Sequence, residues 1–494
     1  GIVTQAARTL IRDIVALGVA QGSVMPTARL ILKSVNVEMV GDVDRHSIAR
    51  IVKEGYIAAM LQAVDEIRSA ESWTGSADET GVKGVDQLAH HGYMRVEGSP
   101  NRVLRFFGTR PQPGKSSEQQ IKALASMLSE FIDNHNSSPL GQEQPITLAE
   151  LLEKLTGWGS DHAEDQKKFF RLLEEWKHDI DREARGRASL HTMAAEAPAE
   201  LVEHIALSLQ MTIERVGGMA RWEALLDEER NTLLSTVERE LCIRMGQKVV
   251  DAMTAEERTH IDLLVWAGCA MHKEQNSVKG GAAAMKAFWA SLQDSSGPVL
   301  LPNRDNAATV AASQSTSGVP TKQSAAATRA EGVSDSGGVK LTTLAGLIFN
   351  HHDDKKGQQR NFRIFFEHAL GYSVSFPHTS NNRFGTHCQA ASLLLLHLPL
   401  FLQFLELIRD KKDKMAFNNM ENNIYHGLTD IPTLTELAVL ALYAQSVSHP
   451  YTRVVRGSGR ENALLLGAFH HDVVAHCQAI IDNPDLLLAL DVRT

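Results

Sequence analysis

Residues 73–107 decide the fold of this chain, because they carry three short stretches with the composition of β-strands: Trp73-Thr74-Gly75-Ser76-Ala77, His91-Gly92-Tyr93-Met94-Arg95-Val96 and Arg102-Val103-Leu104-Arg105-Phe106-Phe107. Gly, Ser-Pro and Asn signals separate these stretches. Short strands joined by such turns are typical of an antiparallel meander. The sequence therefore predicts three strands here, whereas a chain without them would be an all-helical interaction protein.

The residues that follow predict two helices around a further strand. Residues 116–134 carry apolar side chains at helical spacing, and residues 164–181 have the same pattern. Between them, the short apolar run 152–158 ends in the turn Gly159-Ser160-Asp161. The expected order of elements is therefore three strands, a helix, a strand and a helix. This order predicts an α/β core with a mixed sheet.

The rest of the chain is mostly helical in pattern. In the N-terminal helical region, 1–70, the segment Gly41-Asp42-Val43-Asp44-Arg45-His46-Ser47 has the composition of a turn, either in a helix-turn-helix or in an ordinary helical hairpin, with Asp44 or Ser47 as the next N-cap. The other expected segments are the first part of the core at 71–181, a helical insertion at 182–260, a core strand with a Cys-x-x-His turn at 261–292, a flexible Ser-, Ala-, Thr- and Gly-rich linker at 293–340, the remainder of the insertion with an Asn-Arg-Phe turn at 341–385, and C-terminal helices that carry a glutamate of the core at 386–494.

The composition predicts a soluble globular protein. The 494 residues are 43% hydrophobic with a formal net charge of −9, which argues against a generally basic DNA coat but is compatible with local phosphate-binding patches. Four cysteines are too few for a disulfide framework, so a reducing compartment is expected. The longest apolar run, 391–408, is interrupted by polar residues and Pro399, and the N-terminus lacks the pattern of a secretion signal. We therefore expect neither a membrane span nor secretion.

Three carboxylates in separate stretches are candidate metal ligands: Asp78, Asp161 and Glu436. Mg²⁺ prefers hard oxygen ligands, and two such ions about 3.5–4 Å apart can stabilise both the attacking and the leaving oxygen of phosphodiester cleavage. Each carboxylate also has an ordinary structural interpretation, as a turn residue for Asp78, an N-cap for Asp161 and a partner of the helix dipole for Glu436. Glu79 and Asp165 are rival ligands.

Two further groups are candidates for supporting roles. Cys269 and His272 have the spacing of half a zinc site, for which the segment 470–477 offers the best partners; a strand-end turn held by hydrogen bonds is the other interpretation. Arg383 lies in the turn Asn382-Arg383-Phe384, where it could bind a phosphate, brace the turn or face solvent. Motifs of serine hydrolases, P-loop NTPases and dinucleotide-binding proteins are absent from the sequence.

The order of these pieces resembles the RNase H-like DDE transposases of the hAT superfamily and related fungal (basidiomycete) transposase-derived proteins. The resemblance covers roughly residues 72–460 and rests on the phrases Ser160-Asp161-His162-Ala163-Glu164-Asp165-Gln166-Lys167-Lys168, Cys269-Ala270-Met271-His272-Lys273-Glu274-Gln275-Asn276 and Asp430-Ile431-Pro432-Thr433-Leu434-Thr435-Glu436-Leu437. That family has its first Asp on the first strand, its second Asp after the fourth, a C/D-x-x-H signature after the fifth, an Arg-Trp turn beyond a helical insertion, and its Glu on a late helix.

The chain departs from the family pattern in three respects. Phe384 stands where the family has tryptophan. The helical block 182–258 precedes the Cys-x-x-His strand, whereas the large insertion of the family follows it. An N-terminal zinc-binding BED finger and a C-terminal dimerisation segment are not recognisable in the sequence.

The resemblance implies an RNase H-like mixed-sheet core embedded in large, mainly helical N-terminal, insertion and C-terminal regions. It implies a DDE transposase that cleaves and transfers DNA strands in the nucleus. The implied partners are transposon ends and target DNA. A homo-oligomer is possible, and no association with a membrane is expected. Asp78, Asp161 and Glu436 would hold two Mg²⁺ or Mn²⁺ ions, supported by Cys269, His272 and Arg383. The alternative is a domesticated protein that has lost catalysis and serves as a DNA-binding or protein-interaction scaffold.

Overall fold

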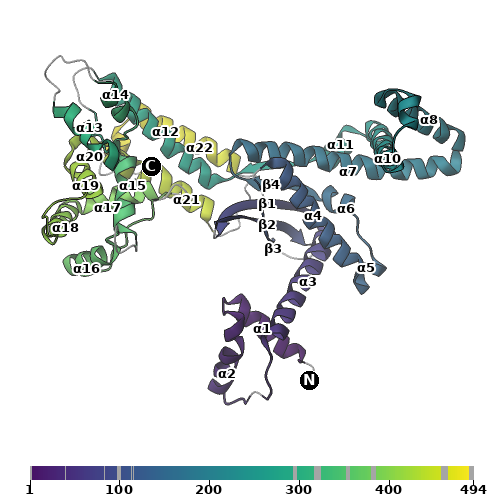
Figure 1. Ribbon diagram of the computed structural model, residues 1–494, viewed down its shortest axis with the longest axis horizontal. Helices are drawn as coiled ribbons and strands as arrows, with labels where there is room; N and C mark the ends of the chain where they lie inside the picture. Colours follow the sequence, from purple (N-terminus) through teal and green to yellow (C-terminus); the bar gives the residue numbers. More distant parts are fainter. Residues whose placement is uncertain are drawn as a thin grey trace. The chain divides into compact units, whose positions relative to one another are not determined.

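The structure is a computed structural model that describes residues 3–38, 40–82, 84–96, 102–112, 114, 116–292, 297–315, 324–351, 357–379, 385–457 and 466–488. The chain divides into two compact units, Gly1–Gly268 and Cys269–Thr494. Within the described ranges the first unit contains a sheet and helices, and the second is built from helices (Figure 1). The fold is therefore mixed α/β and mostly helical.

A five-stranded mixed sheet forms the centre of the first unit. Its strands are β1 (Ala70–Val82), β2 (Val85–Val96), β3 (Val103–Pro111), β4 (Leu155–Ser160) and β5 (Val265–Gly268), and their order is β3-β2-β1-β4-β5. β2 pairs antiparallel with both β1 and β3. β4 lies parallel to β1, and β5 lies parallel to β4. The predicted three-stranded meander is confirmed, and its strands are longer than predicted.

The two faces of the sheet differ in burial, because side chains alternate between the faces along each strand. The buried residues of β2 are Leu88, His90, Gly92 and Met94. This face packs against α3 (Arg45–Ser69), α4 (Ser117–Asn136), α6 (Leu148–Glu153) and α7 (Glu164–Glu196), which complete one hydrophobic core. The opposite face, here called the open face, is half-buried or exposed along the strands; its side chains include Thr74, Ser76, Asp78, Ala89, His91, Tyr93, Arg95, Leu104 and Phe106.

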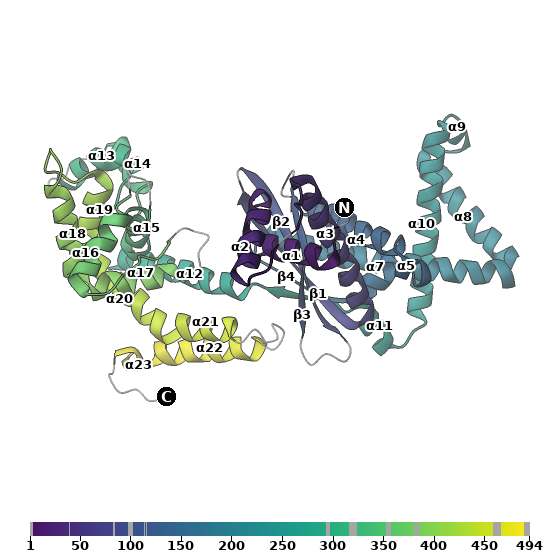
Figure 2. The same ribbon diagram turned by 90° about the horizontal axis from the view of Figure 1, so that it is seen from below.

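A block of helices leaves the sheet after β4 (Figure 2). It consists of α7, α8 (Pro198–Val216), α9 (Met219–Glu223), α10 (Asp227–Asp251) and α11 (Ala255–Asp262). Helices α7 and α10 cross at Gly186 and Gly246, where a Cβ atom would stand 1.7 Å from the Cys242 carbonyl oxygen and 1.9 Å from the Arg182 carbonyl oxygen, respectively. The two helices therefore pack backbone against backbone, and only glycine fits at either position.

A buried lysine joins this block to the sheet. Lys177 of α7 is 2% exposed, and its ammonium group donates to the carbonyl oxygens of Leu155 at 2.7 Å and Leu263 at 3.0 Å. Leu155 begins β4, and Leu263 precedes β5. Burial lowers the pKa of Lys177 to about 8. The Lys177 side chain thus attaches the beginnings of β4 and β5, which are neighbours in the sheet, to the same helix, α7.

The N-terminal helices form a small core of their own in the first unit. α1 (Gln5–Ala16), η1 (Gln21–Ser23), α2 (Val24–Ser34) and the start of α3 surround it. Asp44 caps α3 as predicted, because its carboxylate accepts the N–H groups of His46 and Ser47. Residues 35–44 separate α2 from α3, more than the three or four residues of a helix-turn-helix, so of the two alternatives the connection is closer to an ordinary helical hairpin.

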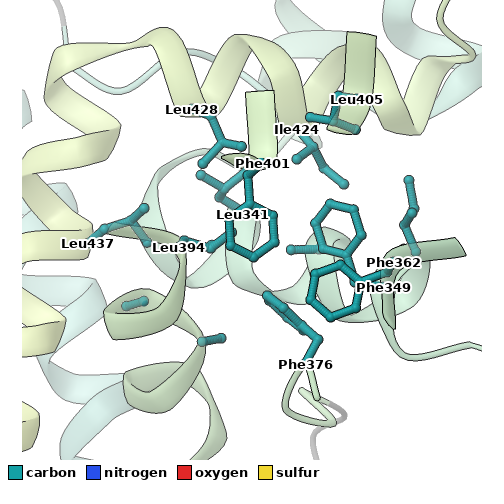
Figure 3. Packing of buried hydrophobic residues seen from close by; sticks show 14 of the residues in the cluster. Leu341, Phe349, Phe362, Phe376, Leu394, Phe401, Leu405, Ile424, Leu428 and Leu437 are labelled. Atoms are coloured by element: carbon teal, nitrogen blue, oxygen red, sulfur yellow. The ribbon is translucent and has the colours of Figure 1, made fainter. Parts of the chain in front are cut away.

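The second unit is a helical body around a core of aromatic side chains. Phe349, Phe362 and Phe401 stack or tilt against one another with ring centroids 5.2–5.8 Å apart (Figure 3). The helices are α12 (Ala270–Ser291), α13 (Arg304–Ser315), α14 (Ala325–Gly332), α15 (Gly337–Phe349), α16 (Gln359–Leu370), α17 (Thr386–Leu396), α18 (Leu398–Asp410), α19 (Asn419–Thr429), α20 (Ile431–Tyr443), η2 (Ala444–Ser448), α21 (His449–Arg456), α22 (Leu466–Asp482) and α23 (Asp485–Leu488).

Two segments of this unit differ from the prediction. The segment 293–340, expected as a flexible linker, contains α13, α14 and the start of α15, and its small residues pack closely enough to bury Ala327 and Ala330. Within the region 386–494, where the sequence predicts helices without placing a break, α17 and α18 are separate and meet at 86°, with Pro399 in the first turn of α18.

In the described part of the chain, no single helix has the length and apolar composition needed to cross a membrane. α17 and α18 meet that test only when they are taken as a bent pair.

Candidate active site

Asp78 lies inside β1, so its interpretation as a turn residue is wrong. It stands opposite Ala89 of β2, and the hairpin continues four residues further to the Val82–Val85 pair. Its side chain is exposed on the open face. Glu79, the rival ligand, is the next residue of the strand, so strand alternation directs it to the opposite face. Asp78 and Glu79 therefore cannot serve the same site from an extended strand.

Asp161 follows the last residue of β4 directly, as predicted. Its Oδ1 atom accepts the Ala163 N–H at 2.9 Å, which forms a turn just ahead of α7. The N-cap of α7 is Ala163 itself, so Asp161 is a turn residue and not the predicted N-cap. Asp165, its rival, lies in the first turn of α7, and its backbone carbonyl accepts from Ser117 Oγ at 2.7 Å.

The register of β1 and β4 brings the two aspartates to matching positions. Ser76 pairs with Gly159 in the parallel ladder, and Asp78 and Asp161 each lie two residues beyond that pair. Neighbouring strands are about 4.8 Å apart, and residues two apart share a face. Asp78, inside β1, and Asp161, just beyond the end of β4, therefore lie at the same level of two adjacent parallel strands, an arrangement in which two carboxylates can share a cation.

The end of β4 is held in place by contacts with β5. Trp266 donates from Nε1 to Ser160 Oγ at 3.0 Å, and its ring meets the His162 ring edge-on at 5.2 Å. The neighbouring positions on the Asp78 face are small, including Ser76 and Gly159. The end of β4 beside Asp161 is thus fixed by β5, and the positions next to the two carboxylates on this face carry small residues.

Glu436 belongs to α20 in the second unit and is 7% exposed. Its Oε2 accepts the Gly338 N–H at 2.7 Å, and its Oε1 accepts Trp289 Nε1–H at 3.0 Å. Burial raises the pKa of Glu436, an effect that these two hydrogen bonds oppose. Two of the four lone-pair positions of the carboxylate are therefore occupied, and two are available to a ligand.

The Glu436 carboxylate lies against the first turn of α15. Gly337 has φ +85°, and a Cβ atom there would stand 2.2 Å from Glu436 Oε2, so glycine is required both for the backbone conformation and for the space. Glu436 also lines a cavity of about 620 Å³ together with Lys286, Lys340 and Trp289. The carboxylate thus holds a helix terminus and faces a cavity with two basic side chains.

Replacing Glu436 by glutamine tests the structural part of this arrangement. The amide oxygen can accept from only one of the two donors while the NH₂ group faces the other, so we expect the free energy of unfolding to fall by about 1–3 kcal/mol. Denaturant unfolding of the Glu436→Gln protein measures it. Trp289→Phe, which removes only one donor, is expected to have a smaller effect. An unchanged unfolding midpoint for Glu436→Gln would contradict the assignment.

The Cys-x-x-His pair begins α12, where Cys269 is the N-cap residue and His272 lies in the first turn. His470 lies beside this turn, but both of its ring nitrogens contact other groups: Nε2 lies 3.1 Å from Tyr451 Oη, and Nδ1 lies 3.4 Å from Lys273 Nζ. Within the described ranges, no group of three or more His, Cys, Asp or Glu side chains is arranged to hold a metal ion. Arg383, with Asn382 and Phe384, lies outside the described residues.

Sequence reasoning missed two side chains that organise these surroundings. Trp289 contacts Glu436 from a helix 147 residues earlier in the chain; the signal was a tryptophan in a helix that otherwise carries few large residues, because a buried indole N–H needs an acceptor. Glu274, 4% exposed, accepts from Ser448 Oγ at 2.7 Å and from the Gly385 N–H at 3.2 Å. The feature of the sequence that could have indicated Glu274 was its charge, two residues after the Cys-x-x-His pair.

Neither the protein-family models nor the curated proteins compared with this chain gave a match.

Proposed function

We propose that this chain is a transposase-like protein with an RNase H-like core, which cleaves and transfers DNA strands in a metal-dependent reaction. The observation that carries the proposal is the register of two adjacent parallel strands, which puts Asp78 inside β1 level with Asp161 just beyond the end of β4. The resembled family has its first Asp on the first strand and its second after the fourth, and the order β3-β2-β1-β4-β5 is compatible with that description. Transposon-end and target DNA in the nucleus are the partners that follow from this proposal.

The proposed reaction assigns a separate role to each of these residues. Asp78 and Asp161 would hold Mg²⁺ or Mn²⁺, which in such sites lowers the pKa of the attacking water or hydroxyl and stabilises the departing 3′ oxygen. Asp161 is held by the Ala163 N–H, so its free oxygen has a fixed direction. Glu436 is the third carboxylate that the resemblance assigns, and Cys269, His272 and Arg383 are proposed as supporting residues. Water acts first as the nucleophile, and a 3′-hydroxyl follows in strand transfer.

Nicking of supercoiled plasmid DNA tests the proposal without knowledge of a target sequence. The full chain is expected to convert supercoiled plasmid to the open circle in Mn²⁺ or Mg²⁺ and to stop when EDTA is added. Activity that survives in EDTA, or that remains in a protein carrying both Asp78→Asn and Asp161→Asn, would refute the proposal.

A second candidate function is a scaffold that keeps the fold without catalysis. The observation that favours it is Glu436, whose two oxygens both hold neighbouring groups in the second unit. Manganese binding separates the two candidates, because a scaffold should show no Mn²⁺ signal by electron paramagnetic resonance that depends on Asp78 and Asp161. A signal lost in the Asp78→Asn, Asp161→Asn protein would favour the enzyme.

A further inference from the structure

The open face of the sheet carries aromatic side chains in line with the aspartate pair. Phe106 of β3 stands opposite His91 of β2, and His91 stands opposite Ser76 of β1, two residues before Asp78. One step further along the strands, Leu104 stands opposite Tyr93. Paired residues form rows across the strands. The row with His91 and Phe106, and the next row with Tyr93 and Leu104, are here called the aromatic rows. The first of them is directly beside the row that contains Asp78.

These side chains are exposed to an unusual degree for apolar groups on a sheet. Phe106 is 58% exposed and Leu104 is 54% exposed. The His91 and Phe106 rings lie 5.2 Å apart at an interplanar angle of 43°, so they form one continuous ring surface. On the other face of the same strands, Phe107 is 3% exposed. A contiguous exposed apolar patch of this kind marks a binding surface.

The charges on the open face are separated along the strands. Arg95 and Arg102 are exposed at the end of the β2–β3 pair away from Asp78. At about 3.4 Å per residue, the level of Asp78 and that of Arg95 lie about 20 Å apart, with the aromatic rows between them. Two arginines, the aromatic rings and the aspartate proposed as a metal ligand thus follow one another along the same surface.

We propose that the open face binds a single-stranded segment of DNA, with bases stacked on Phe106, His91 and Tyr93 and phosphates near Arg95 and Arg102. Aromatic side chains on a sheet and a basic rim are the two parts of a single-strand binding platform, and every base offers a ring face to such a surface. The direction of the strand toward the aspartates rests on the proposed function. The binding itself does not, because stacking and phosphate contacts need no metal.

Fluorescence anisotropy with a labelled oligothymidylate in EDTA tests the platform on the full chain. The loss of one base–aromatic stack lowers affinity about 5- to 150-fold, so Phe106→Ala is expected to weaken binding by a factor in this range. Phe106→Tyr should bind as the unmodified chain does, whereas Phe106→Leu should bind as weakly as Phe106→Ala, because leucine keeps the apolar area but offers no ring. The oligothymidylate annealed to its complement should bind more weakly than the single strand.

Two controls make the result decisive. Tyr372 belongs to the second unit and is 55% exposed, and Tyr372→Ala should leave the affinity unchanged. Binding of the oligothymidylate in EDTA by an unmodified chain that does not nick plasmid would separate failure of the proposed catalysis from failure of the platform. Undetectable binding by the unmodified chain, or equal affinity for Phe106→Ala, overturns the proposal. Self-association in sedimentation experiments that disappears in Phe106→Ala would also overturn it, because the occupant would then be a second copy of the chain.

Discussion

Replacing Asp161 by asparagine is expected to lower metal-dependent plasmid nicking by about 10³-fold or more. Metal ions contribute several kcal/mol to stabilising the charge of the transition state, and about 4 kcal/mol corresponds to a factor of about 10³. The asparagine side-chain oxygen can still accept the Ala163 N–H, which Asp161 accepts at 2.9 Å, so the turn before α7 should survive. Initial nicking rates in Mn²⁺, alongside circular dichroism of the variant, measure the effect.

The matched control is Glu164→Gln. Glu164 is an exposed carboxylate three residues further on, and its ion-pair partner is Lys167, so its loss changes the local charge equally and should leave nicking unchanged. Asp78→Asn should match Asp161→Asn, and the double variant should be no worse than either single one, because residues that act as one unit are not additive. Nicking by Asp161→Asn at the rate of the unmodified chain would remove Asp161 from the site.

The second large effect concerns the stability of the first unit in acid. His90 is 1% exposed, and neither of its ring nitrogens has a hydrogen-bond partner within the described residues. Burial lowers the pKa of His90 to about 4, with smaller contributions from Arg110 and His91. The unfolded chain, with an ordinary histidine pKa of 6.5, binds the proton first as the pH falls. Stability is therefore lost between pH 6.5 and 4, by about 3 kcal/mol at most.

His90→Phe is expected to remove this acid sensitivity. The phenylalanine ring can keep the edge-on contact that His90 makes with Trp158, at 6.5 Å between ring centroids, and it has no unsatisfied nitrogen. Urea unfolding at a series of pH values measures the effect, and the slope between pH 6.5 and 4 should flatten by the His90 contribution. His91→Phe, in the neighbouring half-buried position, is the control and should retain the slope. An unchanged slope in His90→Phe would contradict the assignment.

The strands could be predicted because their signals are local. Trp73, Tyr93 and Phe106 lie in short stretches bounded by turn residues, and the apolar run before Asp161 identified β4 in the same way. The register could not be predicted, because it depends on an irregularity between Trp73 and Thr74 that shifts β1 against β4. That shift, which the pattern of residues does not contain, brings Asp78 level with Asp161.

The second unit was harder to predict because its contacts are distant in sequence. Nothing near Glu436 indicates that Gly338 and Trp289, 98 and 147 residues earlier, supply its hydrogen-bond donors. The segment with α13 and α14 was taken for a linker because Ser, Ala and Thr are common to flexible segments and to closely packed small helices. Composition alone does not separate these two cases.

The glycine crossing of α7 and α10 has a mechanical consequence. α7 is a single helix of 33 residues, about 50 Å long, whose first turn begins three residues after Asp161. The crossing at Gly186 and Gly246 fixes α7 to a second long helix, α10. Lys177 fixes α7 to two strands of the sheet. The two helices should therefore move as one rigid body about their attachment to the sheet. The turn that holds Asp161 is therefore joined directly to a rigid pair of helices.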